Sequence, residues 1–142
     1  MRISSRAALI AVAGLLAAAA LAVAKSATIG VGRAEVKGHK ESVAVTARGV
    51  TLYQLAPESS RHLVCRSRDC FAAWPPLKAN GAVTKMAGVH GRLGTIKRGG
   101  FTQVTLNGKP VYTFVEDGGR RGQAEGEGIN NFGGVWHVFK ER

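Results

Sequence analysis

The sequence predicts an all-β domain, a small antiparallel sandwich or barrel built from two related β-hairpin repeats. Three observations lead to this fold class. Segments rich in Val, Thr, Tyr and Phe recur along the chain, a similar stretch occurs twice at an offset of 59 residues, and helical periodicity is absent after residue 24. Of the 118 residues that follow residue 24, 18 are glycine, which is typical of short strands joined by many tight turns.

The N-terminal segment has the pattern of a signal peptide. A short basic stretch, residues 1–6, precedes an unbroken run of apolar and small residues, 7–24, and Ala22-Val23-Ala24 forms an A-x-A cleavage signature before Lys25. The apolar run is long enough for a retained membrane anchor, but it is mostly alanine, a weak composition for a membrane span. We therefore expect a signal helix that is removed, export to the periplasm or the medium, and no stable membrane span afterwards.

The chain without this leader is long enough for one compact domain with a modest core. We expect residues 25–42 to be an N-terminal linker or the approach to a first strand, and residues 43–142 to form the two-repeat β domain. Repeat one covers residues 43–77 and repeat two covers residues 102–139. Since neither repeat could bury an apolar face alone, the two should share one core.

The two repeats align over residues 45–58 and 104–117, and each segment then runs through a polar loop to a single tryptophan. The matched pairs at this offset are Val45 with Val104, Thr46 with Thr105, Gly49 with Gly108, Tyr53 with Tyr112, Leu55 with Phe114, and Glu58 with Asp117. The tryptophan that follows is Trp74 in the first copy and Trp136 in the second. Self-similarity at a fixed offset indicates two copies of one supersecondary unit.

The strands of each copy follow from turn signals and composition. Asn107-Gly108 separates residues 103–106 from 111–114 and is the strongest short hairpin signal in the chain, and Arg48-Gly49 takes the equivalent place in the first copy. Residues 93–96 and 135–139 add two further strands, which brings the expected number to about six.

A family resemblance lies in the motif of residues 112–117, which fits Tyr-x-(Phe/Trp/Tyr)-x-x-Asp, together with the cysteine pair that leads to Trp74 and the glycine-rich stretch into Trp136. On these motifs the chain resembles a family of bacterial exported proteins and lipoproteins, described as a secreted repeat of unknown function. The resemblance covers residues 43–139 and implies location and repeat architecture, with no established activity. Two departures are Leu55 and Glu58 in the first copy, and the absence of the lipid-attachment cysteine of many relatives. The motif positions are Tyr53, Glu58, Trp74, Tyr112, Phe114, Asp117 and Trp136.

The chain has two cysteines, Cys65 and Cys70. In an oxidising compartment an even number of cysteines favours a disulfide, which here would fix a local turn. The alternative is a copper or zinc site, or a redox site, in which His62 joins the two thiolates. The spacing matches neither a Cys-x-x-Cys redox motif nor a haem attachment motif, so the disulfide is the favoured interpretation.

The motif of residues 112–117 allows a structural and a metal-binding interpretation. On a strand, Tyr112 and Phe114 point to the same face and are expected to fill the core, while Asp117 accepts backbone N–H bonds in the turn that follows. The alternative is a calcium site made by Asp117, Glu125 and Glu127, which the intervening arginines disfavour. The seven glycines of residues 118–134 precede neither Lys-Ser/Thr nor a helix, so we expect a flexible connection and not a phosphate-binding loop.

The charge balance indicates anionic partners. After the leader, 18 Lys and Arg face 9 Asp and Glu, a net charge of +9. Such a surface attracts envelope polyanions, and the other expected partner is an exported protein. Nucleic acid is expected to bind in vitro but not in vivo, because the chain is exported. No set of nucleophile, acid and base is visible in the sequence.

These observations predict an exported, non-catalytic domain of the cell envelope that binds or scaffolds a partner, with no cofactor. The alternative function is a periplasmic metal-binding or redox accessory protein that uses the region of Cys65 and Cys70.

Overall fold

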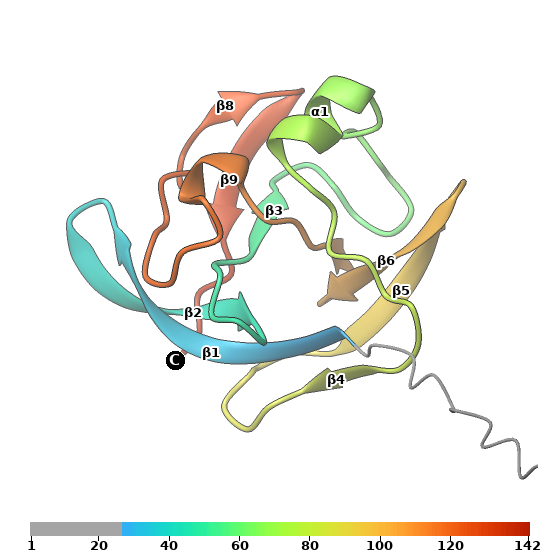
Figure 1. Ribbon diagram of the computed structural model, residues 1–142. Helices are drawn as coiled ribbons and strands as arrows, with labels where there is room; N and C mark the ends of the chain where they lie inside the picture. The colour runs from blue at the N-terminus through green and yellow to red at the C-terminus, as the bar shows by residue number, and fades with distance from the viewer. Residues whose placement is uncertain (1–26) are drawn as a thin grey trace, which may run out of the picture.

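The computed structural model describes residues 27–142, which form three small β-sheets with one short helix and one 3-10 turn (Figure 1). The predicted signal helix and its cleavage site at Ala24 lie outside the described residues. The elements are β1 (Ala27–Val36), β2 (His39–Thr46), β3 (Tyr53–Leu55), α1 (Arg68–Ala73), β4 (Val83–Lys85), β5 (Leu93–Arg98), β6 (Phe101–Leu106), β7 (Lys109–Pro110), η1 (Val115–Asp117), β8 (Asn130–Asn131) and β9 (Gly134–Val138). In residues 27–142 no helix is long and apolar enough to cross a membrane.

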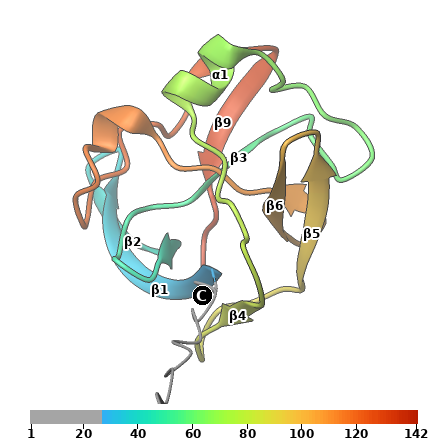
Figure 2. The same cartoon turned by 45° about the vertical axis from the view of Figure 1, so that its right-hand side comes forward.

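The first sheet has the order β2-β1-β4 and lies at the end of the molecule opposite α1 in both views (Figures 1 and 2). β1 and β2 form a long antiparallel hairpin whose two turn residues, Lys37 and Gly38, both have positive φ. The segment expected to be a linker or the approach to a strand therefore contains the ten-residue strand β1. β4 runs parallel to the start of β1, with Ala27 opposite Val83. The prediction of a purely antiparallel architecture is therefore wrong for this pair of strands.

The second sheet has the order β5-β6-β7 and contains the predicted Asn-Gly hairpin. Asn107 and Gly108 have φ values of 54° and 72°, as a two-residue I′ turn requires, and Thr105 lies opposite Pro110. The second arm was expected to run from residue 111 to residue 114, but the strand ends at Pro110. Val111 still donates its N–H to the carbonyl of Val104, and from Tyr112 onward the backbone pairs with Tyr53 instead.

The third sheet has the order β3-β9-β8 and joins repeat one to the end of repeat two. Tyr53 lies opposite Val138, and Leu55 lies opposite Trp136. On its other side Tyr53 exchanges both backbone hydrogen bonds with Tyr112, at N–O distances of 2.8 and 3.0 Å. The two repeats therefore meet at their tyrosines.

The helix α1 was not predicted, because six residues are too short to display helical periodicity. The hydroxyl of Ser67 accepts a hydrogen bond from the backbone N–H of Cys70 and caps the N-terminus of α1. The helix lies at the same end of the molecule as β9 in both views (Figures 1 and 2). Its residues Phe71 and Ala73 pack against the larger of two hydrophobic clusters.

The larger cluster is a core that both repeats build, as the sequence predicts. Tyr53, Leu55 and Trp74 come from repeat one, and Tyr112, Phe114 and Trp136 come from repeat two. The second cluster lies between the first two sheets and includes Ile29, Leu52, Val104, Leu106 and Phe139.

Candidate functional site

The motif residues converge where the two repeats meet, and each tyrosine binds the acid of the other repeat. The hydroxyl of Tyr53 donates to Oδ2 of Asp117 at 2.7 Å, and the hydroxyl of Tyr112 donates to Oε2 of Glu58 at 2.8 Å. All four residues are at most 1% exposed. Together with the two backbone bonds between Tyr53 and Tyr112, these two side-chain bonds form a reciprocal lock between the repeats.

The remaining carboxylate oxygens hold the loops that follow the motif. Oε1 of Glu58 accepts the backbone N–H groups of Val64 and Cys65, both at 2.8 Å. Oδ1 of Asp117 accepts the backbone N–H of Glu125 at 3.0 Å. Asp117 therefore does accept a backbone bond, though from a residue eight positions on and not from the immediate turn. Glu58, which departs from the family pattern, takes the same role as Asp117.

The two tryptophans stack on each other beside the lock. Their ring centroids lie 3.9 Å apart with an interplanar angle of 5°, and both indole N–H groups donate to Oδ1 of Asn131, at 3.2 Å from Trp74 and 2.7 Å from Trp136. Phe114 stacks on Trp74 at 4.2 Å. Leu55, the other departure from the family pattern, is fully buried at the equivalent place. The sequence gives no signal for Asn131, because nothing local marks its side chain as a shared acceptor.

Burial changes the acid–base behaviour of the lock. Desolvation by burial raises the pKa of Tyr53 and of Tyr112 far above that of a free phenol, and the hydrogen bonds to Asp117 and Glu58 add to the effect. Both hydroxyls therefore stay protonated and act as donors. The pKa of Asp117 is also raised by burial, although the donors Tyr53 and Glu125 lower it in part.

The raised pKa of Asp117 predicts an unusual pH dependence. In the range between the ordinary aspartate pKa and the raised one, the folded chain holds a proton that the unfolded chain has lost. The contribution of Asp117 to stability is therefore complete below the ordinary pKa and is lost as the pH rises through the raised value. We expect the wild-type free energy of unfolding, relative to that of Asp117→Asn, to fall across this range. Urea unfolding at a series of pH values measures the difference, and a rise with pH would contradict the assignment.

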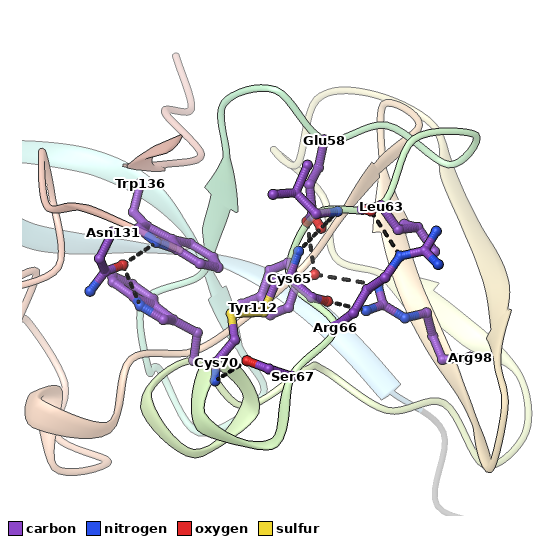
Figure 3. The surroundings of a disulfide bond; sticks show 12 residues. Glu58, Leu63, Cys65, Arg66, Ser67, Cys70, Arg98, Tyr112, Asn131 and Trp136 are labelled. Carbon is purple, nitrogen blue, oxygen red and sulfur yellow. Dashed lines mark hydrogen bonds between the residues drawn. A yellow bond between two sulfur atoms is a disulfide. The ribbon is translucent and has the colours of Figure 1, made fainter. Parts of the chain in front are cut away.

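Cys65 and Cys70 form a disulfide that links the segment bound by Glu58 to helix α1 (Figure 3). Their Cα atoms are 5.7 Å apart, and both residues are buried. The bridged sulfurs offer no thiolate to a metal, and His62, the third candidate ligand, is exposed. Within residues 27–142, no group of three or more His, Cys, Asp or Glu is placed to hold a metal ion.

Two of the three acids of the alternative calcium site bind other partners through their side chains. Asp117 binds Tyr53, while Glu127 accepts the backbone N–H of Val138 at 2.7 Å and contacts Nδ1 of His137 at 2.9 Å. The glycine-rich stretch, which was expected to be a flexible connection, packs against the core at Gly126. A Cβ atom at Gly126 would lie 2.7 Å from the ring of Trp74 and 2.9 Å from that of Tyr53, so the absence of a side chain permits the close packing.

Outside the core, positive charge gathers between residues 61 and 98. This segment has eight Lys and Arg and a single acid, Asp69. The cations are Arg61, Arg66, Arg68, Lys78, Lys85, Arg92, Lys97 and Arg98. A surface pocket of about 280 Å³ is lined by Leu63, Arg66, Phe71, Lys97, Arg98 and Gly99. The fold thus brings Arg66 close to Lys97 and Arg98, which lie about thirty residues later in the sequence.

Arg98 joins this basic pocket to the core. Its guanidinium donates to the backbone carbonyl of Cys65 (Figure 3). It also donates to Oε1 of Gln103 at 3.0 Å and to the hydroxyl of Tyr112 at 3.4 Å. It also lies over the ring of Phe71, 5.2 Å from the centroid. Sequence reasoning grouped Lys97 and Arg98 as a basic cluster but did not find this positioning role.

The fold and the lock define a duplicated β domain whose two repeats complete each other's core. Residues 94–140 match the family model described as a secreted repeat of unknown function, which confirms the resemblance seen in the sequence. The matched segment includes the motif from Tyr112 to Asp117 and the second tryptophan, Trp136. No curated protein and no solved structure matches the chain.

Proposed function

We propose that this protein is an exported, non-catalytic domain of the cell envelope, located in the periplasm, that binds an anionic polymer through the basic pocket of Arg66, Lys97 and Arg98. The single observation that carries the proposal is the gathering of cations without acidic partners in residues 61–98. Of the net charge of +9 after the leader, this segment supplies +7.

The core supports a non-catalytic role because its polar groups are already engaged. The hydroxyls and carboxylates of the motif bind one another and the backbone. Among residues 27–142, no buried side-chain nitrogen or oxygen lacks a hydrogen-bond partner. A group that is fully bonded and nearly inaccessible to solvent is poorly suited to act as a nucleophile, acid or base.

The basic pocket supports anion binding because its cations have no competing carboxylate. In the part of the chain that the structure describes, the lysine and arginine ion pairs are limited to Lys140 with Glu41, outside this segment. Nε of Arg66 donates to the carbonyl of Leu63, and Nζ of Lys97 donates to the hydroxyl of Thr102. Both side chains are therefore positioned by neutral acceptors and keep their full charge for a ligand.

Binding of polyphosphate of defined length tests this proposal. We expect Arg66→Gln/Lys97→Gln to weaken binding and to reduce the slope of log K against log salt concentration by about 1–2, because two ion contacts are lost. The matched control is Arg120→Gln/Arg121→Gln, which removes two exposed arginines elsewhere and should have a much smaller effect. Equal losses for both pairs would show that net charge alone drives binding. No binding by the wild-type protein at about 0.15 M salt would refute the proposal.

A further inference from the structure

A second and larger surface hollow lies away from the basic pocket, at the turn that follows β2. It has a volume of about 1010 Å³ and shares no lining residue with the basic pocket. Its apolar lining includes Ala47, Val50, Leu77, Phe114 and Val115. Val115 is 54% exposed, and Phe114 stacks on Trp74, so the aromatic core extends to this groove. The size is that of a site for a small molecule, for which about 300–1,000 Å³ is usual.

In the other half of the molecule, side-chain hydrogen bonds tie together the two segments that correspond to walls of this groove. There, Nζ of Lys109 donates to the carbonyls of Ala56 and Glu58, at 3.1 and 2.9 Å. The hydroxyl of Ser60 also donates to the carbonyl of Gly108 at 2.9 Å. These bonds tie the turn of one hairpin to the loop that follows Glu58.

At the groove, the residues that would make the same bonds have been replaced. An offset of 59 places Val50 where the other repeat has Lys109, and Gly119 where the other repeat has Ser60. Valine cannot donate a side-chain hydrogen bond, and glycine has no side chain. A Cβ atom built at Gly119 would meet no atom within 4 Å, so there is open space at this position. The side-chain hydrogen bonds that tie these segments together in one half of the molecule therefore cannot form at the groove.

The charges of the groove select the ligand. The cation Arg48 lines it together with the polar side chains of Thr46, Asn80 and Thr113, and the lining residues include no carboxylate. Lys78 also lines the groove, but its Nζ lies over the ring of Phe101, 4.9 Å from the centroid and outside this lining. An apolar wall with a cationic rim fits a molecule with an apolar body and an anionic head. We propose that this groove binds a fatty-acid carboxylate, with its alkyl chain against Val50, Phe114 and Val115 and its head group at Arg48.

Three related probes test the charged contact of the head group and the apolar contact of the alkyl chain separately. Isothermal titration calorimetry with decanoate, decanol and butyrate compares a ligand that has both parts with ligands that lack the charge or the long chain. We expect decanoate to bind about tenfold or more tightly than decanol, because charge-assisted hydrogen bonds are lost with the alcohol, and butyrate to show no measurable binding. Equal affinities for decanoate and decanol would contradict the role of Arg48.

Two variants place the ligand in the groove. Val50→Lys introduces the lysine of the other repeat and should abolish decanoate binding by closing the groove, whereas Val31→Lys adds the same charge to an exposed valine elsewhere and should leave binding unchanged. Arg48→Gln should weaken decanoate binding by about tenfold while the binding of decanol stays unchanged. Unchanged decanoate binding by Val50→Lys, with its fold verified by circular dichroism, would overturn the proposal. Because polyphosphate and decanoate are tested separately, failure of this site leaves the proposed function standing.

Discussion

Replacing Trp74 with Ala is expected to lower the free energy of unfolding by about 3–5 kcal/mol. The indole is fully buried and stacks on both Trp136 and Phe114. Its removal leaves a cavity at the centre of the shared core, and Asn131 loses one of its two indole donors. Since the tryptophans are equivalent anchors of the two repeats, Trp136→Ala should cost a similar amount.

Urea unfolding followed by far-ultraviolet circular dichroism measures this loss. Val115→Ala is the matched control, because it also truncates an apolar side chain but at an exposed position, and it should change the stability by less than about 0.5 kcal/mol. A stably folded Trp74→Ala variant that has lost binding would contradict the core role and make this tryptophan a ligand platform.

Replacing Glu58 with Ala is expected to lower the free energy of unfolding by about 3 kcal/mol or more, since each buried donor left unpaired costs about 1–3 kcal/mol. The carboxylate accepts three hydrogen bonds, from the hydroxyl of Tyr112 and from the N–H groups of Val64 and Cys65. Alanine leaves all three donors without an acceptor in a buried site. The backbone near the disulfide should also become more mobile, because Cys65 is both a donor to Glu58 and one of the two bridged cysteines.

Glu58→Gln separates the acceptor role from the charge. The amide keeps one oxygen as an acceptor, so we expect a smaller loss of stability than with Ala. Glu41→Ala is the exposed control: its pair with Lys140 lies at the surface and should contribute no more than about 1 kcal/mol. Thermal unfolding by calorimetry ranks the three variants, and equal melting temperatures for Glu58→Ala and Glu41→Ala would contradict the lock.

Local signals in the sequence predicted a large part of this fold. The hairpin at Asn107-Gly108 follows from the steric requirement for positive φ, and the duplication with its shared core follows from the match between residues 45–58 and 104–117. The favoured disulfide between Cys65 and Cys70 also agrees with the structure. In these cases the physical cause lies within a few residues or in a repeated pattern.

The long-range relations were not predictable from one sequence. The bond from Tyr53 to Asp117 spans 64 residues, and no periodicity marks which repeat supplies the acceptor. The same holds for Asn131, for the parallel pairing of β4 with β1, and for the positioning of Arg98 by the carbonyl of Cys65. The sequence identified the residue types of the lock, but their partners depend on how the two repeats pack.

The groove illustrates a different limit. Nothing in the sequence marks Val50 or Gly119 as functional. The corresponding positions of the other repeat carry Lys109 and Ser60, whose side chains make hydrogen bonds that Val50 and Gly119 cannot make. The groove therefore reflects a difference between the repeats that neither the composition nor the motifs of the sequence indicate.

Double-mutant cycles on the tyrosines and acids test the reciprocal lock most directly. The cycles combine Tyr53→Phe with Asp117→Asn, and Tyr53→Phe with Glu58→Gln, and record the free energy of unfolding of each variant. The lock predicts a coupling energy of about 1–3 kcal/mol for the pair from different repeats and a value close to zero for the pair from the same repeat. Coupling of equal size in both cycles, or coupling confined to Tyr53 and Glu58, would contradict the exchange between repeats and would leave the motif acids free for another role.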